Sequence, residues 1–98
     1  MIQRFCFVKL EAHDEHDEHD DREALADELR AELAEAGADA IVGTPADDSA
    51  ARWDLAITIT AASQDAWHAL AAHPSVVAIF EKLAARAHVV KAWTFRAR

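Results

Sequence analysis

The sequence has one cysteine, two glycines, two prolines and no tyrosine among its 98 residues. A single cysteine, Cys6, cannot form an internal disulfide, so we expect the reducing environment of the cytoplasm. We expect Cys6 itself to be a small buried apolar residue. Long apolar runs and a signal-peptide pattern are also absent, so the sequence predicts no membrane partner.

Acidic residues outnumber basic residues, and the excess of acidic residues lies in one short stretch. The formal net charge is −8, and residues 11–21 contain seven acids and no lysine or arginine. The rest of the chain sums to a net charge of only −1. This balance argues against a nucleic acid partner. We expect residues 11–20 to form an acidic, His-rich loop within a single domain that spans residues 1–98, since 52% hydrophobic residues suffice for one core.

Hydrophobic periodicity predicts alternating strands and helices. Strands are expected at residues 2–10, 38–44, 52–61 and 88–95. A helix should begin at Asp20 or Asp21 and end at Gly37, with a buried stripe formed by Leu25, Leu29, Leu33 and Ala36. A second helix should follow Ser63 and break at Pro74, with a further segment at residues 75–86. On this segment we expect an apolar face of Val76, Val77, Phe80, Leu83 and Ala84. The order β-α-β-β-α-β predicts an α+β, ferredoxin-like fold with both helices on one face of a four-stranded antiparallel sheet.

The other face of this sheet should be apolar and open. Strand alternation places four aromatic side chains and one lysine on it, namely Phe5, Phe7, Lys91, Trp93 and Phe95. Monomeric proteins seldom expose a contiguous apolar patch of this size. We therefore expect these residues to form the interface of a homodimer.

Several short motifs, in this order and spacing, resemble the Dabb family of stress-responsive, dimeric α+β barrel proteins. They are Phe5-x-Phe7-Val8-Lys9-Leu10, Val42-Gly43-Thr44-Pro45-Ala46, Trp53-Asp54-Leu55-Ala56, His73-Pro74 and Val90-Lys91-Ala92-Trp93-x-Phe95. The resemblance covers roughly residues 2–95. It implies a ferredoxin-like protomer whose sheet packs face to face with that of a second copy in a dimeric barrel.

Some enzymes that resemble this sequence are cofactor-independent polyketide cyclases. The resemblance implies three cleft residues in them: a first-strand histidine, a tyrosine shortly before the His-Pro pair, and a histidine after it. Here these positions hold Arg4, Leu70 and Val76, and only His73-Pro74 matches. The acid and base that ring closure needs are replaced, so we do not expect cyclase chemistry.

A ligand site is predicted between the sheet and the helices. Arg4 should lie on the helix-facing side of the first strand, where it either pairs with Asp27 or another acid of the first helix, or binds an anion. His73 either bonds a freed backbone group at the helix break or serves as a catalytic base or ligand contact. The remaining candidates, which form either plain core or a pocket wall, are Trp53, Trp67 and Phe80. Such a pocket would suit a small, partly apolar carboxylate.

The acidic loop carries a second candidate site, formed by His13, His16 and His19. Imidazole and carboxylate groups suit zinc, nickel or manganese. The alternatives are a solvated repeat expansion, adventitious binding of a divalent metal, and a dedicated metal site.

Two functions therefore compete. One is a binding or enzymatic role of the sheet–helix cleft toward a small molecule, and the other is a non-enzymatic, stress-associated structural dimer with metal on the His/Asp loop. Whether the protein is an enzyme stays open at this point, and we expect no cofactor.

Overall fold

The computed structural model describes residues 1–11 and 18–98, with side chains from Arg22 onward after the gap. Four strands form an antiparallel sheet: β1 (Ile2–Leu10), β2 (Asp39–Gly43), β3 (Leu55–Ala61) and β4 (Ala87–Arg96). Their order in the described sheet is β2-β3-β1-β4, so β1 lies between β3 and β4.

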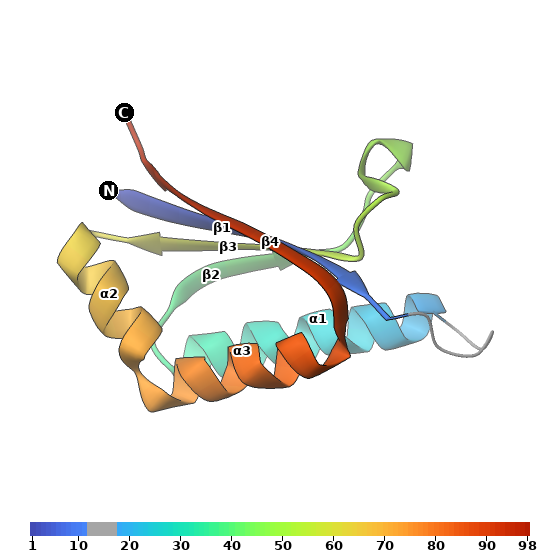
Figure 1. The fold of residues 1–98 in the computed structure, drawn as a ribbon, viewed down its shortest axis with the longest axis horizontal. Coiled ribbons are helices and arrows are strands. Elements are labelled where there is room, and N and C mark those ends of the chain that lie inside the picture. The colour runs from blue at the N-terminus through green and yellow to red at the C-terminus, as the bar shows by residue number, and fades with distance from the viewer. Residues whose placement is uncertain (12–17) are drawn as a thin grey trace.

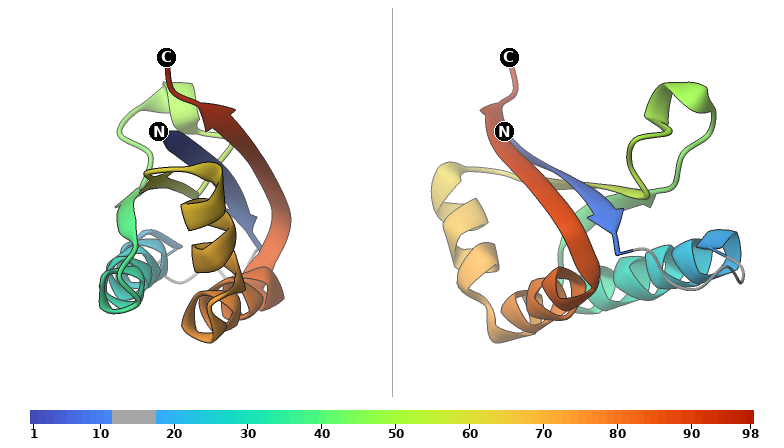
Figure 2. Two further views of the ribbon diagram at one scale, coloured as in Figure 1. Left: turned by 90° about the vertical axis from the view of Figure 1, so that its left-hand side faces the viewer. Right: turned by 45° about the vertical axis from the view of Figure 1, so that its right-hand side comes forward.

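The three described α-helices cover one face of this sheet, as Figures 1 and 2 show. They are α1 (Glu18–Glu35), α2 (Gln64–Ala72) and α3 (Pro74–Arg86), and the short helix η1 (Asp48–Ala50) lies in the β2–β3 connection. The predicted α+β, ferredoxin-like fold is confirmed. None of the described helices is long and apolar enough to cross a membrane.

Helix ends follow the local signals in the sequence except at the start of α1. This helix begins at Glu18, before the expected start at Asp20 or Asp21 and within the residues 11–20 that were expected to form a loop. Gly37 has a φ of 83°, and the Ala38 N–H donates to the Leu33 carbonyl, which closes the end of α1 as expected. Ser63 caps α2, since its Oγ accepts from the Ala66 N–H at 3.1 Å. The break between α2 and α3 falls at Pro74, which has no N–H to continue the α2 hydrogen bonds.

The hydrophobic core lies between the sheet and the helices α1 and α3. Leu25, Leu29 and Leu33 of α1 are buried, as their spacing predicts. On α3 the buried residues are Val76, Ile79 and Leu83, whereas Val77 and Ala84 of the predicted apolar face are exposed. The sheet contributes Ile2, Cys6, Val8, Leu55, Ile57 and Ile59. Val76 and Leu83 of the predicted apolar face are therefore buried as expected, and Ile79, which was not part of that face, is buried with them.

Candidate functional site

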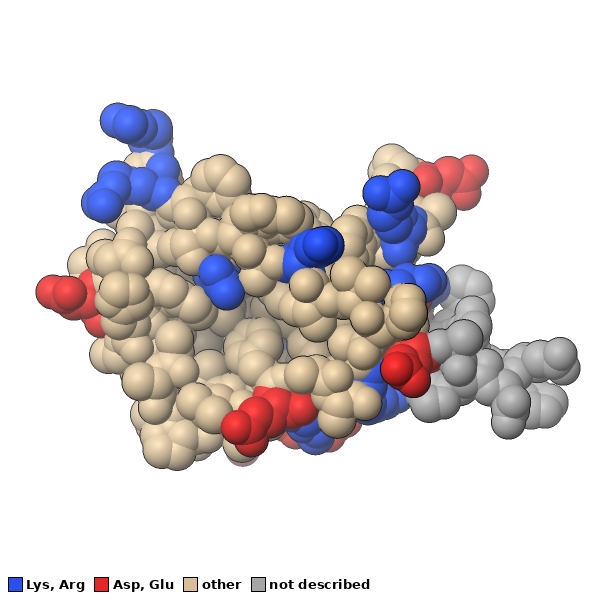
Figure 3. All heavy atoms as spheres, in the orientation of Figure 1, with Lys and Arg blue, Asp and Glu red and all other residues tan. Residues whose placement is uncertain are grey.

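A cavity of about 430 Å³ lies between the sheet and the two C-terminal helices. Strands β1 and β4 form one wall, and α2 and α3 form the other. Its lining residues are Arg4, Cys6, Trp67, Ala71, Val76, Val77, Phe80, Glu81, Ala84, Val90 and Ala92. Figure 3 shows the molecule hollowed between the sheet and α3 in this view.

Most of the side chains that line the cavity are small. Alanine or valine occupies six of the lining positions: Ala71, Ala84, Ala92, Val76, Val77 and Val90. Meanwhile α3 directs its larger Ile79 and Leu83 into the core. Trp67 and Phe80 are the large apolar side chains of the helix wall, and the cavity is within the size range of small-molecule sites.

Arg4 lies in this cavity wall without an acidic partner among the described residues. Its Nη1 donates to the Thr94 Oγ1 at 2.8 Å, and its guanidinium lies over the Trp67 ring, 5.6 Å from the ring centroid. No described carboxylate comes within ion-pair distance of it, and Asp27 instead pairs with Arg30 at 3.5 Å. The expected salt bridge to the first helix is therefore not formed within the described residues.

His73 does not line the cavity. It precedes α3 in an extended conformation, and its Nδ1 accepts from the Ser75 N–H at 3.2 Å. The imidazole is thus engaged as the N-cap of α3 and is exposed. Of the two predicted roles, the structure shows the bond to backbone at the helix break, and it does not bring His73 to Arg4.

Trp53 also lies away from the cavity, contrary to the predicted pattern. The strand β3 begins at Leu55, so the alternation that buries Leu55 does not extend back to Trp53. Its ring instead contacts Phe7, with centroids 5.8 Å apart, on the side of the sheet that the helices leave open. Trp67 and Phe80 do line the cavity with Arg4.

Cys6 forms part of the cavity wall and is only 4% exposed. Burial raises the pKa of its thiol above the ordinary value, and the nearby charge of Arg4 opposes this rise only in part. At pH 8 the folded protein therefore holds less thiolate than the unfolded chain. We expect iodoacetamide to alkylate native Cys6 at least about tenfold more slowly than Cys6 in urea, as followed by mass spectrometry. Equal rates would contradict this assignment.

The open face of the sheet carries the predicted aromatic cluster. Phe5 packs edge-on against Phe95 with centroids 5.7 Å apart, and Phe7 lies 5.9 Å from Trp93. Trp93 and Phe95 remain 46% and 55% exposed. Lys91 pairs in register with Phe7 and is exposed beside them.

Several residues of these two surfaces were not among those expected from the sequence. Ile41 of β2 extends the aromatic face and is 72% exposed, and alternation within residues 39–43 is the signal that could have identified it. Glu81 and Val90 line the cavity that contains Arg4, and Thr94 accepts the hydrogen bond from Arg4. Their proximity depends on strand register and helix orientation, for which the sequence carries no local signal.

The side chains of the predicted metal site lie outside the part of the chain that the structure describes. His13 and His16 lie outside the described residues, and so does the side chain of His19. Within the described residues, no group of three or more histidine, cysteine and acidic side chains is placed to hold a metal ion.

Comparison with known proteins supports the fold. The sequence matches no protein-family model, and no curated protein matches it. Among solved structures, a dimeric ferredoxin-like protein of unknown function from Thermobifida fusca is 15% identical with a TM-score of 0.74, covering 98% of this chain and 90% of its own. A dabb family protein with a ferredoxin-like fold from Mesorhizobium loti is 13% identical with a TM-score of 0.71, covering 99% and 96%.

An enzyme also shares this fold. The hydroxynitrile lyase from Passiflora edulis is 9% identical with a TM-score of 0.75, and the match covers 99% of this chain and 93% of the lyase. At such identities the likeness establishes the fold alone. The ferredoxin-like architecture expected from the Dabb resemblance is therefore confirmed, and a dabb family protein is among the structures that share it.

Proposed function

We propose that this protein is a cytoplasmic homodimer that binds a small, partly apolar carboxylate in the cavity between the sheet and the helices. The observation that carries the proposal is Arg4, a cation in the wall of a largely apolar cavity, with no described carboxylate within ion-pair distance. A charged group in such a place is stabilised by an anionic ligand.

The surroundings of Arg4 favour a carboxylate with an apolar body. Trp67 covers the face of the guanidinium, and the Thr94 hydroxyl oxygen accepts one hydrogen bond from its Nη1. The other N–H groups of the planar fork stay available for a two-point contact with a carboxylate. Phe80, Val77 and Val90 provide apolar contacts for the rest of the ligand.

The proposed dimer forms through the open face of the sheet. Its aromatic side chains and Ile41 give each protomer an exposed apolar surface that spans β2, β1 and β4. A second copy would cover this surface, and the structurally similar Thermobifida fusca protein is described as dimeric. Such an interface should bury more than about 2,000 Å² in total, as permanent homodimers do.

Replacement of Arg4 tests the proposed ligand class. Using hexanoate, octanoate and decanoate as probes in calorimetry, we expect Arg4→Gln to weaken binding by about tenfold to hundredfold, because a charge-assisted hydrogen bond is lost. Arg4→Lys should restore part of the affinity by returning the charge without the planar fork. Octan-1-ol should bind both proteins equally weakly.

The matched control is Arg30→Gln, which removes an exposed arginine of α1 that pairs with Asp27 outside the cavity. This variant should bind the fatty acids as the wild type does. Unchanged affinity in Arg4→Gln, or no binding of any of the three carboxylates to the wild type, would contradict the proposed function.

A further inference from the structure

We infer that the ligand of this cavity carries an amine as well as a carboxylate, at opposite ends of an apolar body, as an ω-amino carboxylate does. This inference rests on the proposed function and extends it. The observation behind it is a second charged side chain, Glu81, which lines the same cavity from α3. Arg4 lies on the facing wall, in β1.

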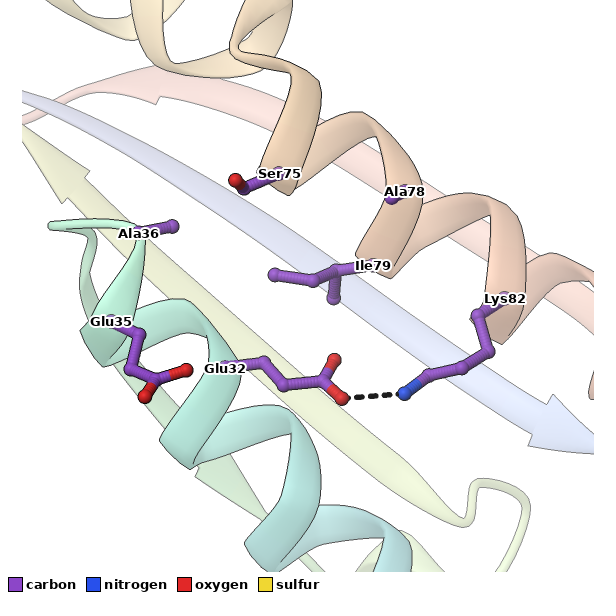
Figure 4. Close-up of a pocket in the computed structure, with 7 residues that line it drawn as sticks. All are labelled: Glu32, Glu35, Ala36, Ser75, Ala78, Ile79 and Lys82. Carbon is purple, nitrogen blue, oxygen red and sulfur yellow. Dashed lines mark hydrogen bonds and ion pairs between the residues drawn. The ribbon is translucent and has the colours of Figure 1, made fainter.

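Glu81 has no hydrogen bond or ion pair among the described residues, although a lysine follows it in the chain. The side chain of Lys82 turns toward α1, where its Nζ lies 2.7 Å from Glu28 and 2.6 Å from Glu32. Figure 4 shows the Lys82–Glu32 contact in the groove between the two helices. These hydrogen bonds raise the pKa of Lys82, chiefly through Glu28. The helix α3 therefore presents Lys82 to α1 and Glu81 to the cavity.

Arg4 and Glu81 line one cavity but are not ion-paired with each other. The wall between them is apolar, with Cys6, Phe80 and Ala92 among its residues. Figure 3 shows basic atoms on the sheet side of the hollow, and both acidic and basic atoms on the α3 side. A ligand that spans the hollow would meet a cation at one end and an anion at the other.

A ligand with a carboxylate alone would pair with Arg4 and leave its apolar end beside the charged Glu81 carboxylate. An amine at the far end removes this mismatch and adds an attraction to the Glu81 carboxylate. Because Glu81 is exposed at the edge of the cavity, its pair with an ammonium group should be modest, at roughly a fivefold gain in affinity.

The test compares ω-aminohexanoate, ω-aminooctanoate and ω-aminodecanoate with the fatty acids of the same lengths in calorimetry. We expect at least one amino carboxylate to bind wild type about fivefold more tightly than its matched fatty acid. Glu81→Gln should abolish this advantage and leave fatty acid binding unchanged or slightly stronger. Glu23→Gln, the same change at an exposed residue of α1 away from the cavity, should keep the advantage.

The outcomes separate this inference from the proposed function. Fatty acids that bind through Arg4, with no gain from the amine at any length, would overturn the inference and leave the proposed function standing. An amine advantage that persists in Glu81→Gln would also overturn it. If neither series binds, the proposed function fails as well. Circular dichroism of each variant confirms that the compared proteins are folded.

Discussion

Trp93→Ala should convert the proposed dimer largely to monomers at micromolar concentration. In the protomer the Trp93 side chain lies against Phe7 in the aromatic cluster and is still 46% exposed. In a dimer built on this face, its indole would be buried with the aromatic cluster, and tryptophan is among the residue types that contribute most to the binding energy of interfaces. We expect the loss to cost roughly 3–5 kcal/mol, which raises the dissociation constant by about a hundredfold to a thousandfold or more.

Size-exclusion chromatography with light scattering over a dilution series measures this effect. The control is Trp67→Ala, which removes the same side chain from α2 on the opposite side of the sheet and should leave the dimer intact. A wild-type protein with the mass of one protomer, 10.8 kDa, at every concentration would refute the dimer and with it this prediction.

Asp54→Ala should lower the free energy of unfolding by about 2–4 kcal/mol. The Asp54 carboxylate joins three segments of the fold just before β3. Its Oδ2 accepts the Leu10 N–H at 2.8 Å at the end of β1 and lies 3.5 Å from the Lys9 Nζ. Its Oδ1 lies 3.3 Å from the Arg22 Nη1 of α1.

The expected cost is large because this group is mostly buried. The side chains of Asp54 and Arg22 are only 15% and 16% exposed. Removal of the carboxylate leaves the Leu10 N–H without its acceptor and takes the negative charge from beside the Arg22 guanidinium. The more exposed contact with Lys9 should contribute little.

Urea unfolding of matched variants tests this prediction. Asp54→Asn retains an oxygen for the Leu10 N–H but loses the charge, so it should fall between wild type and Asp54→Ala. Asp27→Ala removes an acid whose pair with Arg30 is largely exposed and should cost at most about 1 kcal/mol. The interpretation fails if Asp54→Ala is no more destabilised than Asp27→Ala.

Much of the fold could be predicted because its signals are local. The alternation over residues 2–10 predicts β1 with its observed ends, and the Leu25, Leu29 and Leu33 spacing predicts the buried side of α1. Gly37 and Pro74 mark the helix ends through their own backbone chemistry. Strand alternation also placed Phe5, Phe7, Trp93 and Phe95 on one face, because side chains in a strand alternate whatever the tertiary context.

The candidate site was less predictable, because its residues meet only through long-range packing. Trp53 precedes an alternating strand, but the strand begins two residues later, so the ring lies on the opposite side of the sheet. Asp27 is an acid in the helix expected to reach Arg4, yet it pairs within α1. His73 has the residue type of a catalytic base, and its ring bonds the backbone of Ser75.

The sequence by itself determined the order of strands and helices, the residues that end the helices, and the aromatic face of the sheet. These features follow from side-chain periodicity and backbone preferences within a few residues. Only the tertiary structure decided that Arg4 bonds Thr94, 90 positions along the chain, and that Glu81 shares its cavity. The register of β4 against β1 and the orientation of α3 determine these contacts. Both arise from packing of the whole core rather than from any local sequence pattern.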